Sequence, residues 1–253
     1  MIHFDAVTLF PEMLAHACGF GVTGRARERG VWQLALWNPR DFATDAYRTI
    51  DDRPYGGGPG MVLMAGPLVQ ALAAARAAQA DAGCARGRTV YLSPAGTPLT
   101  HSAVMEFAAD SRPLTLVAGR YEGVDQRVVE REIDDEVSVG DFVVSGGELP
   151  ALLLIDAIVR QLPGALNDAE SARQDSFADG LLDCPHYTRP ERFEDRAVPE
   201  VLLSGDHAAI RRWRRKQALG RTWQRRPDLL ARRVLSRDDE ALLSEFKVEL
   251  KDN

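Results

Sequence analysis

Three short loops rich in glycine and other small residues follow three consecutive apolar runs of the sequence. Residues 92–96 read LSPAG, residues 119–123 read GRYEG, and residues 137–149 read VSVGDFVVSGGEL. Glycine lets a ligand approach the backbone, whose N–H and C=O groups can read an adenine edge without side chains. Each loop alone is also compatible with a tight turn. Together they favour a ligand site, because open α/β sheets bind ligands at the carboxyl ends of their strands.

A second candidate for chemistry is the segment DSFADGLLDCPHYTRPERF at residues 175–193, which carries three aspartates, a His-Tyr pair and arginines. Irregular polar segments of this kind often hold substrate contacts, although an ordinary solvated loop would look the same. His186 fits a structural role as well as a catalytic one. Earlier in the chain, Arg160 follows Asp156 by four positions in a predicted helix. That spacing fits a surface ion pair or a guanidinium facing an anionic oxygen, and it does not separate the two.

The charge of the chain is concentrated in one segment. The net charge is −6, yet residues 205–233 contain ten Lys or Arg and only two Asp. A basic segment on an acidic body predicts a docking surface for a polyanion, with a solvated helix face as the alternative. We expect Trp213 and Trp223 to pack in a helical core, on a face that Trp213 shares with Ile210 and Gln217. We expect the basic side chains on the other side to contact phosphates: Arg211, Arg212, Arg215 and Lys216.

The sequence argues against several other kinds of functional site. Gly19, Gly21 and Gly24 match GxGxxG, but a helix-like segment precedes them where a dinucleotide site needs a strand. The phosphate-loop, HExxH and GxSxG motifs are absent, and no His, Asp and Glu cluster has metal-ligand spacing. We therefore expect no protein metal site. The three cysteines are far apart, which argues against a disulfide framework and favours a reducing cytoplasm.

The elements that must position these residues alternate between strand-like and helical patterns through the first two thirds of the chain. We predict strands at 2–9, 31–37, 88–92, 114–118 and 136–139. We predict helices after Pro11 and at 67–80, from Thr100 as N-cap, and at 124–132 and 149–161, with Glu148 capping or charge-paired at the start of the last. This pattern predicts an α/β fold with a largely parallel sheet.

Beyond that region the pattern is mainly helical, with helices expected near 206–219, 228–235 and 238–251. Residues 163–172 are small and polar, which is typical of a linker. We predict an α/β domain at 1–162, a flexible linker at 163–174 and a small helical domain at 175–253. The N-terminus lacks a signal peptide pattern and the longest apolar run is too short to cross a bilayer, so we expect a cytoplasmic protein without membrane attachment.

Six long motifs carry a resemblance to a known family. They are GGGPGMVL, YLSPAG, AGRYEGVDQRV, SVGDFVVSGGEL, DSFADGLLDCPHYTRP and GDHAAIRRWRRKQALGRTWQRRPDLL, between residues 56 and 230. In content and order they resemble the bacterial tRNA (guanine-N1)-methyltransferases of the SPOUT superfamily. The resemblance implies a SPOUT-type N-terminal domain with a deep trefoil knot, and a homodimer with its active site at the subunit interface. It also implies methyl transfer from S-adenosylmethionine to N1 of guanosine at tRNA position 37, giving 1-methylguanosine.

The resemblance also implies which residues form the site. Asp175 matches the family's catalytic aspartate and Arg160 its assisting arginine, while Arg189 joins the basic residues named above as a tRNA contact. Phe142 stands where a tyrosine is common. The family's activity is associated with Mg²⁺, for which we find no protein site. The implied donor-binding residues are Tyr91, Leu92, Ser93, Pro94, Gly119, Tyr121, Glu122, Gly123, Ser138, Val139, Gly140, Asp141, Phe142, Val143, Val144, Gly146 and Gly147.

The chemistry is consistent with these roles. Neutral guanine holds a proton on N1, which a carboxylate can accept while a guanidinium stabilises the charge growing on O6. Because N1 lies on the Watson–Crick edge, the base must be unpaired and turned into the pocket. Two alternatives remain: a related enzyme that methylates a ribose 2′-hydroxyl or another base, and a non-catalytic RNA-binding protein. The segment at 175–190 argues against the first, and the intact glycine loops with Asp175 argue against the second.

Overall fold

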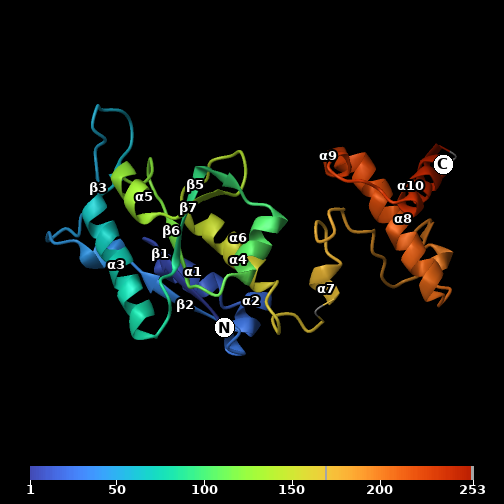
Figure 1. Ribbon diagram of the computed structural model, residues 1–253, viewed down its shortest axis with the longest axis horizontal. Helices are drawn as coiled ribbons and strands as arrows, with labels where there is room; N and C mark the ends of the chain where they lie inside the picture. The colour runs from blue at the N-terminus through green and yellow to red at the C-terminus, as the bar shows by residue number, and fades with distance from the viewer. Residues whose placement is uncertain (169, 252–253) are drawn as a thin grey trace. The chain divides into compact units, whose positions relative to one another are not determined.

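A computed structural model describes residues 1–168 and 170–251 of the chain. The chain divides into two compact units, residues 1–169 and residues 170–253 (Figure 1). A short helix, α7 (Glu170–Arg173), lies within the range predicted as a flexible linker, so that range is not wholly irregular. The predicted roles of the two parts remain predictions.

The first unit is built on a five-stranded sheet in the order β2-β1-β6-β5-β7. Every pairing between neighbouring strands of this sheet is parallel, which confirms the predicted parallel α/β architecture. The three strands that precede the glycine-rich loops are neighbours, because β5 pairs with both β6 and β7. The strands are β1 (Ile2–Val7), β2 (Trp32–Trp37), β5 (Arg88–Pro98), β6 (Leu114–Ala118) and β7 (Asp135–Ser138).

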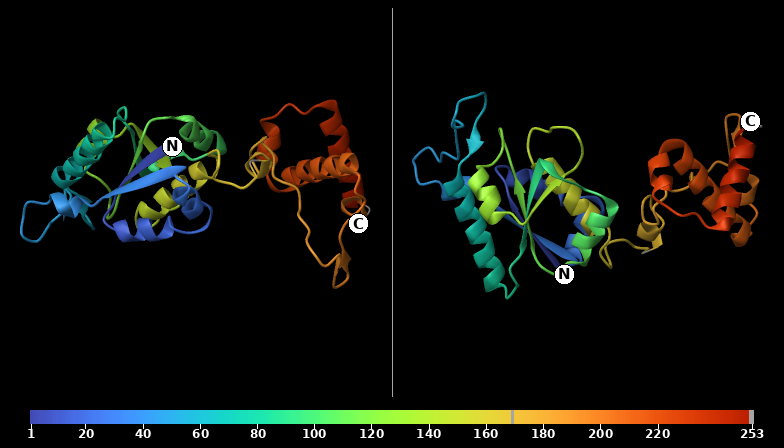
Figure 2. Two further views of the ribbon diagram at one scale, coloured as in Figure 1. Left: turned by 90° about the horizontal axis from the view of Figure 1, so that it is seen from below. Right: turned by 45° about the horizontal axis from the view of Figure 1, so that its top comes forward.

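Helices enclose the sheet on both faces, as Figure 2 shows. One core joins β-strand residues such as Phe4 and Leu116 to Leu154 and Ile158. The other joins Val117 to Leu68 and its neighbours. Since successive strand residues point to opposite faces, Leu116 and Val117 serve different cores. The helices are α1 (Pro11–Ala17), α2 (Gly21–Glu28), α3 (Ala65–Asp81), α4 (His101–Ala109), α5 (Gln126–Glu132) and α6 (Glu148–Val159).

Local chemistry explains where several elements begin. The Thr100 hydroxyl accepts a hydrogen bond from the Ala103 N–H at 3.3 Å, which confirms the predicted cap of α4. Asp125 caps α5 in the same way, so that helix begins two residues later than predicted. Gly21 begins α2 and Gly24 lies inside it, directly after α1, so no strand precedes these glycines. The structure thus lacks the strand that a dinucleotide fingerprint requires at this place.

One predicted boundary is wrong in an informative way. The strand expected at 88–92 continues to Pro98, and the register shifts so that both Leu92 and Thr97 are partners of Val137. The residues between them bulge out of the ladder, as an insertion in a strand must do. A Cβ at Gly96 would lie 2.4 Å from the Val137 nitrogen, so only glycine fits there. The first loop is therefore a bulge within β5 rather than a turn after it.

Short elements that the sequence did not predict complete the first unit. The 3₁₀ helix η1 (Pro39–Phe42) packs against α3. β3 (Asp51–Asp52) and β4 (Val62–Leu63) pair as an antiparallel hairpin, and the glycine-rich turn between them projects from the body in Figure 1. Two-residue strands carry too little periodicity to stand out in a sequence.

The second unit is mainly helical. α8 (His207–Arg225) packs on α10 (Arg237–Lys251), with α9 (Pro227–Ala231) between them in the chain. The prediction ended α8 before Gly220, but the helix continues to Arg225. A Cβ at Gly220 would lie 2.4 Å from the Phe246 ring, so this glycine serves packing and does not end the helix. Here glycine permits close helix packing. The unit also contains η2 (Glu200–Leu202) and a hairpin of β8 (Arg192–Phe193) and β9 (Arg196–Ala197).

None of the helices in the described part of the chain combines the length and the apolar character that a membrane crossing requires.

Candidate functional site

The three glycine-rich segments meet in one pocket at the carboxyl ends of β5, β6 and β7, with a volume of about 280 Å³. Every predicted donor-binding residue except Asp141 lines it. Asp141 is exposed at the tip of a turn in which the Phe142 N–H donates to the Gly140 carbonyl at 2.9 Å. That turn folds the Phe142 ring back over Gly140 and leaves Asp141 outside. Asp141 therefore does not line the pocket in this structure, and its predicted contact with the donor stays a prediction.

The pocket depends on close backbone contacts between loops. The Gly147 N–H donates to the Gly119 carbonyl at 2.8 Å, and a Cβ at Gly147 would lie 2.6 Å from the Ala118 Cα. A Cβ at Gly119 would lie 2.9 Å from the Tyr91 hydroxyl. Such distances are shorter than a Cβ allows to a non-bonded carbon or oxygen, so side chains at these positions would push the loops apart.

A buried ion pair holds two of the loops together. Glu148, at the start of α6, is fully buried, and it accepts hydrogen bonds from Arg120 Nε and the Thr8 hydroxyl, both at 2.8 Å. Arg120 also donates to the Ser145 carbonyl at 3.1 Å. The predicted charge-pairing of Glu148 is thereby confirmed. Because a buried charge needs such partners, Glu148 fixes the second loop against the third.

The projecting β3–β4 hairpin also contacts the second loop, at residues 119–123, through backbone hydrogen bonds. The Glu122 N–H donates to the Met61 carbonyl and the Leu63 N–H donates to the Gly123 carbonyl, both at 2.9 Å. A Cβ at Gly60 would lie 2.2 Å from Glu122 Oε1, so the hairpin lies directly on that side chain. The motif at 56–63 therefore contributes to the pocket indirectly, by packing against the loop that contains Glu122.

The tyrosines of the pocket lie in different surroundings. Tyr91 is buried at its base, and this burial raises the pKa of its hydroxyl. Tyr121 is half exposed and has a positive φ of 61°, an uncommon conformation for a residue with a side chain. Burial, together with the neighbouring Asp51 carboxylate, raises the pKa of Tyr121. Both hydroxyls therefore stay protonated at neutral pH and can donate hydrogen bonds to a ligand.

Sequence reasoning missed several residues of this pocket. Thr8, which bonds Glu148, lies at the end of β1 and carries no sequence signal for that role. Four further lining residues were also missed: Arg120, Val137, Ser145 and Pro150. They lie inside or directly beside the recognised motifs, so a prediction that took each motif with its flanking residues would have included them.

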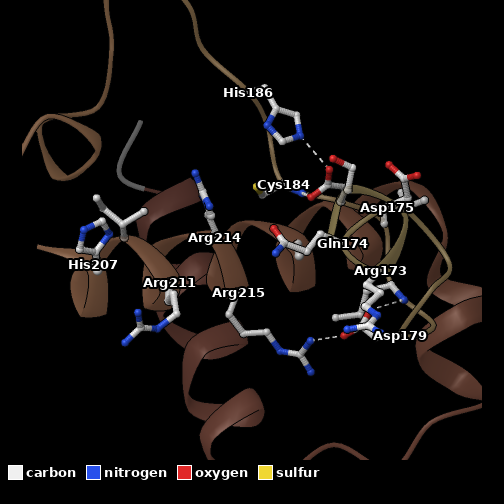
Figure 3. Close-up of a pocket in the computed structure, with 16 residues that line it drawn as sticks. Arg173, Gln174, Asp175, Asp179, Cys184, His186, His207, Arg211, Arg214 and Arg215 are labelled. Carbon is white, nitrogen blue, oxygen red and sulfur yellow. Dashed lines mark hydrogen bonds and ion pairs between the residues drawn. The ribbon is translucent and has the colours of Figure 1, made fainter. Parts of the chain in front are cut away.

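The second unit has a larger pocket, of about 890 Å³, which is lined by Asp175 (Figure 3). Asp175 is half-buried and lies on one side, while His207 and Arg211 from α8 lie on the other. Arg160 follows the last turn of α6 in the first unit and is half-buried. The two predicted catalytic residues thus belong to different units of the chain.

The basic residues of α8 fall into two groups. Arg212 pairs with Glu245 at 2.6 Å, Arg215 pairs with Asp239 at 2.8 Å and with Asp179, and Lys216 pairs with Glu249 at 2.5 Å. Lys216 is only 9% exposed. These three side chains hold α8 against α10 and neighbouring segments, and their predicted contacts with phosphates stay a prediction.

Arg211 and Arg189 are exposed, and neither is ion-paired among the described residues. Trp213 is half-buried beside Tyr187, with ring centroids 6.2 Å apart. Trp223 is 37% exposed and carries Lys247 over its ring, so its predicted place in the core is wrong. The core face of α8 instead contains Leu219 and Gly220, because close packing on α10 occurs there.

Comparison with known proteins identifies the family. Residues 2–232 match the family described as tRNA (Guanine-1)-methyltransferase TrmD. The chain belongs to this TrmD family. It is 63% identical over 246 residues to the tRNA (guanine-N(1)-)-methyltransferase of Aromatoleum aromaticum, covering 97% of this chain and 93% of the relative. It is 61% identical over 249 residues to the protein of the same name from Dechloromonas aromatica, covering 98% of each.

This member of the TrmD family also gathers three metal-ligating side chains that sequence spacing did not single out. The ligand atoms of Asp183, Cys184 and His186 lie within 4.8 Å of one another. The group is held together by its own contacts, since Asp183 accepts from the Cys184 N–H at 2.6 Å and pairs with His186 at 2.7 Å. Although burial opposes it, the His186 hydrogen bond helps to lower the pKa of Asp183. A thiol is also a poor ligand for Mg²⁺, which prefers oxygen.

Proposed function

We propose that this protein transfers a methyl group from S-adenosylmethionine to N1 of guanosine 37 in tRNA, giving 1-methylguanosine. The observation that carries the proposal is the single pocket formed by the three glycine-rich segments, in a chain of the TrmD family. The names of the relatives, tRNA (guanine-N(1)-)-methyltransferases, support the nucleobase and the atom.

The donor pocket fits the methyl donor in size and character. Its volume of about 280 Å³ lies just below the range of roughly 300–1,000 Å³ typical of small-molecule sites. Its walls combine backbone of the glycine loops with apolar side chains such as Leu92, Val139 and Pro150, which suit a purine ring. The Glu122 carboxylate lines the same pocket and suits a cationic group. When bound, S-adenosylmethionine supplies an electrophilic methyl group.

Asp175 acts as the general base in this proposal. Guanine N1 carries a proton, and the nitrogen becomes a good nucleophile only as that proton leaves. Asp175 lines a pocket of about 890 Å³, which has room for a nucleobase turned out of its stack. Its carboxylate accepts the N1 proton there, a contribution of roughly 10²–10⁴-fold to the rate.

Arg160 stabilises the charge that appears on O6 as the N1 proton leaves. It lies directly after α6, the helix that begins at the donor pocket with Glu148. A guanidinium is always charged and presents a rigid fork of donors, so it suits a developing oxyanion. This assignment matches Arg160 to the family's assisting arginine.

We further propose that the active site forms between two subunits of a homodimer. Leu149 and Leu153, one turn apart on α6, are 55% and 49% exposed, whereas the other side of that helix is buried. Exposed apolar residues beside a ligand pocket are typical of an interface. The proposal also includes the trefoil knot that the family resemblance implies, and the close approach of Gly147 to Ala118 and Gly119 is compatible with it.

The proposed function is tested by incubating the purified protein with tRNA transcripts and methyl-labelled donor, then mapping the modified nucleoside. We expect 1-methylguanosine at position 37, and no label in a transcript with adenosine there. Label on a ribose would favour a 2′-hydroxyl methyltransferase, and absence of label with tight tRNA binding would favour a non-catalytic RNA-binding protein. Titrating Mg²⁺ in the same assay tests whether activity depends on this ion, and fractionation of cells tests the expected cytoplasmic location.

A further inference from the structure

The ion pairs of α8 leave one face of that helix with unpaired positive charge. Arg211, Arg214, Arg221 and Arg225 have no ion-pair partner among the described residues, in contrast to Arg212, Arg215 and Lys216. Three of the four are exposed and Arg221 is half-buried. The fold thus divides the run of basic residues into an ion-paired group and, among the described residues, an unpaired group.

The unpaired group forms a continuous stripe. With about 100° of rotation per residue, positions 211, 214, 218, 221 and 225 fall within an arc of about 80° on the helix surface. The paired residues fall within a separate arc of about 100° that includes Leu219, the core residue. At about 1.5 Å per residue, the stripe from Arg211 to Arg225 is about 21 Å long. The small side chain of Ala218 lies at its middle and leaves the stripe free of bulk.

The stripe begins at the pocket that contains Asp175. His207, Arg211, Arg214 and Ala218 all line that pocket, and Figure 3 shows His207, Arg211 and Arg214 on the helix along one side of it. The other arginines of the stripe, Arg221 and Arg225, continue along the same helix face away from the pocket. A polyanion lying along the stripe would therefore pass directly from these arginines to the carboxylate.

We propose that this stripe, Arg211, Arg214, Arg221 and Arg225, is a phosphate track for the RNA strand whose target base enters the Asp175 pocket. Guanidinium forks match phosphate geometry, and a row of them binds a backbone without reading its sequence. The inference rests on the proposed function for the choice of RNA. It adds Arg214, Arg221 and Arg225 as contacts, and it assigns Arg212, Arg215 and Lys216 to the stability of the helical unit.

Two double variants of the full-length protein test the track. Arg214→Gln with Arg221→Gln removes two charges from the stripe. The matched control, Arg212→Gln with Arg226→Gln, removes two charges that the structure pairs with Glu245 and Asp228. tRNA affinity is measured across a salt series, S-adenosylmethionine affinity by calorimetry, and folding by thermal unfolding.

We expect the stripe variant to bind tRNA at least tenfold more weakly, with a salt slope reduced by about 0.7–0.9 for each lost phosphate contact. The control should change affinity less than about threefold, and donor binding should be normal in both. Arg214→Lys with Arg221→Lys should keep the salt slope, because the charge remains. Equal losses in the two glutamine variants, or no loss in the stripe variant, would overturn the track. Methylation of tRNA by the wild type remains a separate readout, so failure of the track and failure of the proposed function are distinguishable.

Discussion

The two pockets of this protein differ in the groups that line them. The pocket of the first unit is formed largely by backbone, where loops approach so closely that Gly119 and Gly147 have no room for a side chain. The pocket of the second unit is lined by charged side chains on α8 and on the segment that contains Asp175. Backbone geometry suits recognition of one fixed small ligand, whereas charged side chains suit proton transfer and phosphate binding. The comparison suggests that binding of the donor and the chemistry on the acceptor base are separable.

The largest effect should come from the carboxylate of the second pocket. Asp175→Ala removes the proposed base, so we expect turnover to fall by about 10²–10⁴-fold. Calorimetric affinity for S-adenosylmethionine should remain close to wild type, because no donor-pocket element is changed. Near-normal turnover would remove Asp175 from the mechanism, and loss of donor affinity would contradict the separation of the two pockets.

The next effect concerns Glu148, the buried carboxylate that holds two loops of the donor pocket together through Arg120. Glu148→Gln leaves Arg120 without its charged partner, and breaking a buried ion pair costs about 3–5 kcal/mol. We expect weaker donor binding and a lower unfolding temperature of the first unit, both measured by calorimetry. Binding of tRNA to the second unit should change much less. Equal weakening of donor and tRNA binding would show that the pockets are not independent.

A single methyl group tests the backbone contacts. Gly147→Ala places a Cβ 2.6 Å from the Ala118 Cα, and overpacking of this kind costs about 1–3 kcal/mol. Donor affinity should fall by about tenfold or more, as measured by calorimetry. The matched change Gly66→Ala, where a Cβ meets nothing within 4 Å, should leave donor affinity unchanged. Similar effects from the two substitutions would contradict a role for close loop packing.

The smallest effect is a pH dependence of the helical unit. The hydrogen bonds from Arg215 hold the pKa of Asp239 below its ordinary value. A carboxylate with a lowered folded pKa stabilises above its unfolded pKa, about 3.9, and that stability is lost as pH falls through the folded value. The unfolding temperature of the second unit should therefore fall as the pH drops below about 4. In Asp239→Asn the unit should be less stable at neutral pH and its acid sensitivity should be smaller.

The sequence predicted the first unit well and the second less well, for a physical reason. Strand periodicity and glycine content report backbone structure directly, so β6 at Leu114–Ala118 and the three glycine-rich loops could be located. The individual pocket residues followed only from the family resemblance. The bulge in β5 could not, because it depends on pairing with β7. On α8, the roles of Arg212 and Lys216 depend on Glu245 and Glu249, which lie more than 30 residues later. Sequence spacing shows where charges are, but only the fold shows which of them are already paired.

The central claim is that the donor pocket of one subunit works with Asp175 of the other. Mixing two impaired variants tests it directly, at a donor concentration too low to fill the weakened Gly147→Ala pocket. Gly147→Ala and Asp175→Ala proteins are denatured together, refolded and assayed for 1-methylguanosine formation. About a quarter of wild-type activity should return, because half of the dimers are mixed and each mixed dimer has one complete site. Activity no higher than that of the separate variants would show that each site is completed within one chain, and would contradict the account.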